Sequence, residues 1–130
     1  MRQLLDTHTF LWFVSGNPEL SEKAKNQILL PVALNFVSMA SLWEIAIKLK
    51  LGKLKIKGSI LSIIDDLSEN NMEVLPINFG HIVKSYEYDF HHRDPFDRII
   101  IAQAEVENML IIGKDEIFDK YLTADLQRIW

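Results

Sequence analysis

The sequence predicts a three-layer α/β/α domain, in which helices cover both faces of a central parallel sheet of four to five short strands. Short apolar runs alternate with segments of helical periodicity, the order found where right-handed crossovers join parallel strands. The 130 residues are 48% hydrophobic and 25% charged, which suits one soluble globular unit. The sequence has no internal repeat, low-complexity tract or linker, so we expect a single domain over residues 1–130.

In the first half of the chain, apolar runs end at polar or turn-forming residues. We expect strands at 1–5 and 34–37, and helices around 10–13, at 22–29 and through 43–49. Asp6 ends the first strand, Pro31 closes the second helix, and Gly52 is a natural stop for the third. Ser38 or Ser41 can cap that third helix.

The second half repeats this alternation. We expect strands at 74–77 and 109–112, an edge strand at 126–130, and helices from 59, from 78 to about 86, at 99–106 and at 116–122. Ser59 opens the first of these helices, whose isoleucine and leucine side chains form one apolar stripe. The pair Asp94-Pro95 is typical of a helix start with proline at the first helical position.

Composition excludes several classes of protein. The chain has no cysteine, which rules out disulfides, thiolate metal sites and a cysteine nucleophile. Its net charge of −4 argues against a large basic surface as the main means of binding nucleic acid. The longest uncharged run, 26–43, contains Pro31 and several polar residues and cannot form a membrane helix. Asp6 and His8 interrupt any signal-peptide core, so we expect a cytoplasmic protein without a membrane partner.

Four carboxylates stand where apolar runs end or helices begin: Asp6, Glu44, Asp97 and Asp115. Because function collects at the carboxyl ends of parallel strands, all four can meet at one edge of the sheet. Each also has a structural explanation worth about 1 kcal/mol: Asp6 and Asp115 as helix caps, Ser41 with Glu44 as a capping box, and Asp94 as a cap with Asp97 at the third helical position. Capping alone does not explain why the four acids can converge.

A cluster of four acids would repel itself by several kcal/mol unless a cation were present. Oxygen ligands without cysteine select a hard ion, so we predict Mg²⁺ or Mn²⁺ held by Asp6, Glu44, Asp97 and Asp115. Such a site suits hydrolysis of phosphodiester bonds, with the same four residues catalytic.

Four segments carry a more specific pattern: Leu-Leu-Asp-Thr-His-Thr-Phe-Leu-Trp at 4–12, Val-Ser-Met-Ala-Ser-Leu-Trp-Glu-Ile-Ala-Ile-Lys at 37–48, His-Arg-Asp-Pro-Phe-Asp-Arg-Ile-Ile-Ile-Ala-Gln-Ala at 92–104, and Leu-Ile-Ile-Gly-Lys-Asp at 110–115. In this order they resemble PIN-domain proteins of the VapC toxin type. The resemblance implies a metal-dependent ribonuclease paired with an inhibitory antitoxin, and it points to the same four acids with Asp94 nearby. Where the family often has Ser or Thr shortly before the last acid, this chain has Gly113 and Lys114.

Other candidate residues carry weaker signals. Thr7 can hydrogen-bond a metal-bound water or Asp6, or cap a helix; Arg98 can contact a phosphate or a neighbouring acid. His92 can touch the substrate or fix its loop, and Asp119 is the rival of Asp115 as the fourth acid. We include Thr7, Arg98, Asp94 and His92 as substrate-binding candidates.

The aromatic residues Trp12 and Trp43 can line a groove for a partner helix, although core packing is the usual role of such side chains. We expect an RNA substrate, a cognate antitoxin and a homodimer. The sequence leaves one alternative on the same fold, a non-catalytic binding module whose acids only cap helices. An aspartate phosphoacceptor of the receiver type would need an acidic pair after the first strand, where Asp6 stands alone.

Overall fold

The computed structural model describes residues 1–89, 94–121, 123 and 126–130. Within this part of the chain a five-stranded sheet runs in the order β3-β2-β1-β4-β5. Its strands are β1 (Arg2–Leu5), β2 (Leu34–Ser38), β3 (Met72–Leu75), β4 (Leu110–Ile112) and β5 (Arg128–Ile129). All four neighbouring pairs are parallel, so the predicted parallel sheet is confirmed.

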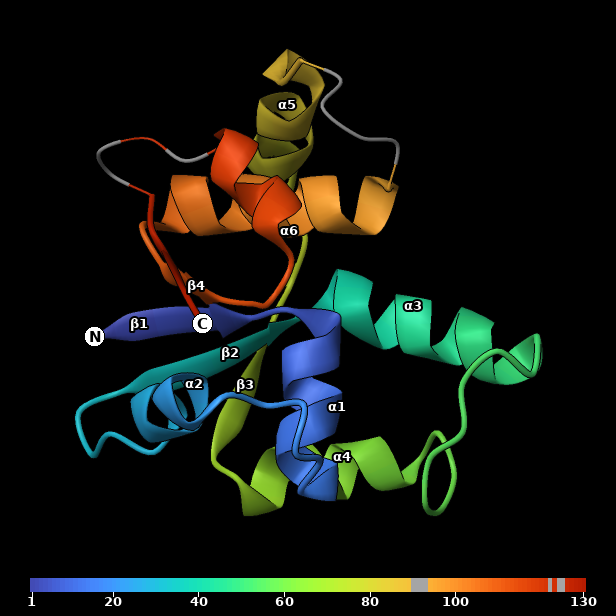
Figure 1. The fold of residues 1–130 in the computed structure, drawn as a ribbon. Coiled ribbons are helices and arrows are strands. Elements are labelled where there is room, and N and C mark those ends of the chain that lie inside the picture. Colours follow the sequence, from blue (N-terminus) through green and yellow to red (C-terminus); the bar gives the residue numbers. More distant parts are fainter. Residues whose placement is uncertain (90–93, 122, 124–125) are drawn as a thin grey trace.

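Helices cover both faces of this sheet, which confirms the three-layer prediction (Figure 1). They are α1 (Thr7–Ser15), α2 (Glu22–Ile28), α3 (Met39–Lys50), α4 (Ser62–Glu69), α5 (Phe79–Glu87), α6 (Pro95–Glu107) and the 3-10 helix η1 (Glu116–Tyr121). Helices α1, α2 and α4 lie on one side of the sheet, and α5, α6 and η1 on the other (Figure 1). Helix α3 leaves the carboxyl end of β2 and contacts both α1 and α6.

Consecutive strand residues point to opposite faces and build two separate cores. Leu5 and Ile112 pack with the α1, α2 and α4 side, whereas Leu4 and Ile111 pack with α6 and η1. All four side chains are fully buried, as expected for a parallel sheet covered on both faces. In the described part of the chain, no helix is both long enough and apolar enough to cross a membrane.

Several predicted boundaries need correction. The third strand ends at Leu75 rather than 77, because Pro76 has no N–H to continue the ladder. The helix predicted from Ser59 begins at Ser62, since 59–61 form a turn in which Ser62 N donates to Ser59 O. The helix at 99–106 is longer and begins at Pro95. The final strand spans Arg128–Ile129 only, and the predicted helix at 116–122 is a 3-10 helix over 116–121.

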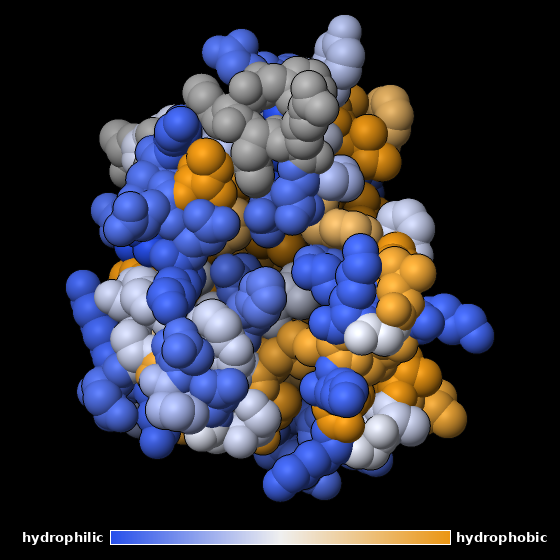
Figure 2. Space-filling view, turned by 45° about the vertical axis from the view of Figure 1, so that its right-hand side comes forward, coloured by the Kyte–Doolittle hydropathy of each residue, from blue (hydrophilic) through white to orange (hydrophobic). Residues whose placement is uncertain are grey.

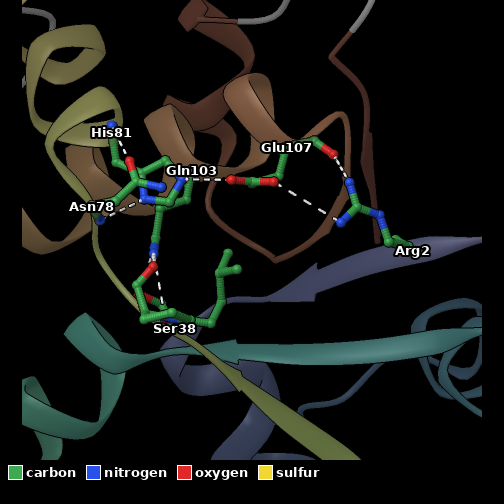
Figure 3. Close-up of polar contacts among 8 residues, drawn as sticks. Arg2, Ser38, Asn78, His81, Gln103 and Glu107 are labelled. Carbon is green, nitrogen blue, oxygen red and sulfur yellow. Dashed lines mark hydrogen bonds and ion pairs between the residues drawn. The ribbon is translucent and has the colours of Figure 1, made fainter.

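Gln103 of α6 joins the ends of two strands to that helix. Its fully buried side chain accepts a hydrogen bond from Ser38 Oγ at 2.5 Å and donates to the carbonyl of Pro76 at 3.2 Å (Figure 3). Ser38 also caps α3, so one buried amide fixes the start of α3 relative to α6. These two helices carry two of the predicted site acids.

A second polar network, shown in Figure 3, ties α5 to the end of α6. His81 Nδ1 accepts from Asn78 N at 3.1 Å while Asn78 Oδ1 accepts from His81 N at 3.0 Å, a reciprocal capping box at the start of α5. His81 Nε2 lies 3.0 Å from Glu107 Oε1, and Glu107 also pairs with Arg2 at 4.0 Å. Because Nδ1 accepts, Nε2 carries the proton toward Glu107.

Candidate active site

Asp6 lies directly beyond β1 and is the N-cap of α1, as predicted. Its Oδ1 accepts from Thr9 N at 2.8 Å, and the residue is buried. The other oxygen, Oδ2, lies against Gly113 at the end of β4. A Cβ added at Gly113 would stand 2.7 Å from Asp6 Oδ2. The glycine that departs from the usual family pattern therefore avoids a close contact with the Asp6 carboxylate.

Glu44 is the sixth residue of α3, and Ser38 is the N-cap of that helix through a hydrogen bond from Ala40 N. The predicted Ser41–Glu44 capping box is therefore wrong, because the helix starts a turn earlier than Ser41. The buried Glu44 carboxylate is instead hydrogen-bonded to the Thr7 hydroxyl at 2.8 Å, which also contacts Ser41 Oγ at 2.9 Å. Capping thus cannot explain Glu44.

Lys48 contacts a predicted site acid, a pairing that the sequence analysis did not predict. Its Nζ lies 2.6 Å from Glu44 Oε2, one helical turn along α3. The signal was present in the i, i+4 spacing of Glu44 and Lys48, which places the two side chains on one face of a helix. Among the lysines at 48, 50, 53, 55 and 57, only Lys48 lies four residues after Glu44, and the lysine-rich composition of this stretch does not distinguish it from the others.

Asp94 and Asp97 begin α6 as predicted. Asp94 is the N-cap and accepts from Phe96 N at 2.9 Å and from Asp97 N at 3.3 Å, with Pro95 at the first helical position. Asp97 is the third helical residue and is partly buried.

The electrostatic surroundings of Asp97 link the predicted acids to one another. Burial is the largest factor that raises its pKa, to about 8 from an ordinary value of 3.8. The negative charges of Asp94, Asp6, Glu44 and Asp115 raise this pKa further, in that order. Burial likewise raises the pKa of Asp6, with a smaller contribution from Glu44. Carboxylates from four separate segments therefore act on one another at this edge of the sheet.

Asp115 and Asp119 differ in their partners. Asp115 accepts from Ile117 N at 2.9 Å at the start of η1, and its charge reaches Asp97. Asp119 makes two 2.7 Å contacts with the guanidinium of Arg128, which lowers the pKa of Asp119. These contacts favour Asp115 as the fourth acid.

The weaker candidates have different surroundings. Arg98 is buried and donates to the carbonyl oxygens of Ser85 at 2.8 Å and Asp89 at 3.2 Å, so it holds the end of α5 against α6. These carbonyl contacts give Arg98 a structural role, and its contact with substrate stays a prediction. Thr7 is buried against Glu44 rather than bonded to Asp6. His92 lies outside the residues that the structure describes.

The predicted donor set suits a hard cation, because every predicted ligand is a carboxylate. Burial, followed by the charges of the neighbouring acids, raises the pKa of Asp97. Among residues 1–89, 94–121, 123 and 126–130, no group of three or more acidic or histidine side chains already surrounds one metal position. The contact of Glu44 with Lys48 shows how one of these charges is balanced in the protein alone.

The parallel sheet, the two-sided helical cover and the acids at its carboxyl edge define the class of this protein. A family model for the PIN domain matches residues 4–122, and the chain belongs to the PIN-domain family. No curated protein matches the chain significantly.

Solved structures of toxin–antitoxin proteins share this fold. VapBC-1 from nontypeable Haemophilus influenzae is 20% identical with a TM-score of 0.72, covering 99% of this chain and 97% of that one. VapBC2 from Rickettsia felis, bound to a promoter DNA fragment, is 16% identical with a TM-score of 0.71 and coverages of 99% and 98%. VapBC-5 from Mycobacterium tuberculosis is 17% identical with a TM-score of 0.64 and coverages of 98% and 97%. The predicted resemblance is thus confirmed in family and fold.

Proposed function

We propose that this protein is a metal-dependent endoribonuclease that cleaves RNA phosphodiester bonds in the cytoplasm as the toxin of a type II toxin–antitoxin pair. The observation that carries the proposal is the gathering of acids from four segments around the partly buried Asp97, where burial and the charges of Asp94, Asp6, Glu44 and Asp115 raise its pKa. A protein tolerates such repulsion where a bound cation relieves it, and strongly shifted pKa values gather at functional sites. Membership of the PIN family supports the same reading.

In this proposal Asp6, Glu44, Asp97 and Asp115 hold Mg²⁺ or Mn²⁺ through carboxylate oxygens. When bound, the ion supplies an activated water and stabilises the negative charge that develops on the phosphate.

The remaining residues orient these acids. Asp6 is held by its cap to Thr9 N, and Asp97 by the N-cap that Asp94 forms on α6. Thr7 contacts one oxygen of the Glu44 carboxylate at 2.8 Å, and Lys48 contacts the other at 2.6 Å. Rigid support of this kind keeps ligands near the productive geometry before any ion arrives.

Cleavage of a mixed RNA pool with and without Mg²⁺ tests the proposal. We expect wild-type protein to cut only with the ion, and Asp97→Asn to be inactive while retaining the fold. Asp65→Asn is the matched control, because Asp65 is an exposed acid of α4. Near wild-type cleavage by Asp97→Asn would overturn the metal-cluster assignment. A folded wild-type protein that binds no metal and cuts no RNA would favour the non-catalytic module.

The antitoxin partner is the second part of the proposal. The structure from M. tuberculosis is a member of the VapBC family of toxin–antitoxin systems, and this chain shares its fold. A cleft of about 510 Å³ between α3 and α4 has an apolar lining that includes Met39, Trp43 and Ile64. Trp43 is 63% exposed, so it is not a core residue. We expect Trp43→Ala to weaken capture of a co-expressed antitoxin without lowering the melting temperature.

We also propose a homodimer, which uses an apolar stripe on α5. Phe79, Ile82, Val83 and Tyr86 recur at helical spacing, and all are exposed. Figure 2 shows hydrophobic residues gathered along one side of the molecule. Sedimentation velocity should give a dimer for the wild type and a monomer for Ile82→Lys. A monomeric wild type would contradict this part of the proposal.

A further inference from the structure

A cleft of about 490 Å³ opens beside the acidic cluster. It is lined by Asp6, His8, Trp12, Lys114, Asp115 and Glu116. Its volume falls within the roughly 300–1,000 Å³ typical of sites that take small ligands. Asp6 and Asp115 belong to the proposed metal site, so an occupant of this cleft would lie next to the phosphate that reacts there.

One wall of the cleft is aromatic. His8 and Trp12 lie one turn apart on α1, with ring centroids 5.4 Å apart and planes inclined by 34°. The ring of Trp130 stands 5.8 Å from that of Trp12. His8 is exposed, and both tryptophans are half-buried against the core. One side of this aromatic wall packs against the core, and the other side is accessible from the cleft.

The same wall carries a cation. Lys114 Nζ lies 5.8 Å from the centre of the Trp12 ring and 2.8 Å from Glu19 Oε2. The side chains of Lys114 and Glu19 are both more than half exposed, and such surface ion pairs contribute little to the stability of the fold. Lys114 can therefore exchange Glu19 for a phosphate at small cost. Lys114 also borders a second cleft of about 440 Å³, which contains Lys23 and Arg128.

We infer that this cleft is a subsite for one nucleobase of single-stranded RNA, stacked on His8 and Trp12 with Lys114 at an adjoining phosphate. The inference rests on the proposed ribonuclease function and extends it to how the substrate is held. Aromatic side chains beside a cation are the usual means of holding single strands, because every base offers a stacking face. A duplex would keep its bases paired and could not supply one to the cleft.

The charges of the cleft make this binding depend on a divalent ion. Asp6, Asp115 and Glu116 repel a phosphate, and Lys114 alone does not balance them. The base and its backbone should therefore bind well only after a cation has neutralised the acids. An apolar partner helix matches this lining less well than a nucleotide, which brings both an aromatic face and a negative charge.

The test uses short single-stranded oligoribonucleotides with 2-aminopurine at successive positions, whose fluorescence falls when the base stacks. Binding is measured in Ca²⁺ and in EDTA, with gels to verify that the RNA stays intact. Trp12→Leu keeps an apolar side chain but loses the stacking face. Val32→Ala removes apolar surface from an exposed residue outside the cleft lining and outside the proposed partner surfaces. Trp12→Phe should restore most of the binding.

We expect quenching at one position, and about a 10-fold loss of affinity in Trp12→Leu, of the size that one stacked base contributes. EDTA should weaken wild-type binding, and Val32→Ala should bind like the wild type. If Trp12→Leu fails to fold, His8→Ala and Lys114→Gln carry the test at exposed positions. Unchanged affinity in these variants overturns the inference.

Loss of antitoxin capture with RNA affinity intact would assign the aromatic wall to the protein partner and would overturn the inference too. Quenching without cleavage in Mg²⁺ would keep the base site but reject the nuclease.

Discussion

The two ends of α6 each carry two acidic residues. The C-terminal pair lies among basic side chains, whereas the N-terminal pair lies among further acidic side chains. At the C-terminal end, Glu107 contacts His81 and Arg2, and Glu105 pairs with Lys84 at 3.3 Å. A helix C-terminus disfavours negative charge, so the basic side chains of His81, Arg2 and Lys84 offset the charges of Glu107 and Glu105 at the negative end of the helix dipole. This end is a structural ion-pair network.

The N-terminal end has the opposite balance. Asp94 and Asp97 gain from the helix N-terminus, yet the pKa of Asp97 is raised because burial and four other acids outweigh that gain. Acidic side chains on one helix therefore form stabilising ion pairs at its C-terminal end and repel one another at its N-terminal end. Strongly shifted pKa values of this kind gather at functional sites, which supports the proposed cation site at this end of α6.

Exchange of one carboxylate for an amide at each end gives the sharpest test. Asp97→Asn should lower cleavage by at least ~100-fold, since loss of an outer-shell group alone costs metal sites 10–100-fold. Its metal-free melting temperature should stay the same or rise, because one repelling group is gone. Glu107→Gln should keep cleavage but lose about 1–2 kcal/mol of stability, since it weakens a contact to the buried His81. Rate measurements and thermal melts of both variants decide it. Equal effects of the two changes on cleavage would erase the proposed difference between the ends.

The pH dependence of stability follows from the raised pKa of Asp97. Above its ordinary pKa of 3.8 the unfolded chain releases this proton, whereas the folded protein keeps it up to about pH 8. The stability due to protonation is complete below pH 3.8 and is lost as the pH rises through about 8. The metal-free melting temperature should therefore fall between pH 5 and 9, and Asp97→Asn should flatten this fall.

Mg²⁺ or Mn²⁺ should reverse that loss at pH 8, because the ion binds the folded, deprotonated cluster. At 100 times its Kd, an ion that binds only the folded state adds about 2.7 kcal/mol. The combined variant Asp6→Asn, Glu44→Gln, Asp97→Asn should show no gain. A wild-type melting curve that millimolar Mn²⁺ leaves unchanged would speak against the cation site.

The sequence predicted the layers of the fold and the caps at or next to two of the proposed site acids, because both depend on local patterns. Apolar runs and the caps at Asp6 and Asp94 are read from neighbours along the chain, and both caps are confirmed. The capping box at Ser41 failed because two serines could begin α3, and the contact of Ser38 with Gln103, distant in sequence, decides between them. The cleft beside Trp12 was equally hidden, since Lys114 reaches it only through the folded sheet. Tertiary contacts of this kind leave no periodicity to read.

A methyl group at Gly113 tests how closely the acidic end is packed. Gly113→Ala would place a Cβ 2.7 Å from Asp6 Oδ2 and 2.9 Å from Phe118 Cε2. The neighbours must shift, which we expect to cost about 1–3 kcal/mol and to slow cleavage by moving Asp6. Ala104→Gly, inside α6, is a control for the reverse change: lower helix propensity and the loss of a buried methyl group should cost about 2 kcal/mol, with cleavage retained. If Gly113→Ala is as active and as stable as the wild type, the close approach of Asp6 is not functional.

The smallest expected effect separates the two candidates for the fourth acid. Asp115 is exposed, and of the four acids that raise the pKa of Asp97 it has the smallest effect. An exposed carboxylate often holds a cation through water rather than directly. Asp115→Asn should therefore slow cleavage by about 10-fold and raise the Mg²⁺ concentration needed for half-maximal rate. Asp119→Asn should leave that concentration unchanged and lower stability slightly, since its partner is Arg128 at 2.7 Å. Rates measured against Mg²⁺ for the two variants side by side decide the assignment, and a larger defect in Asp119→Asn would transfer the fourth position to Asp119.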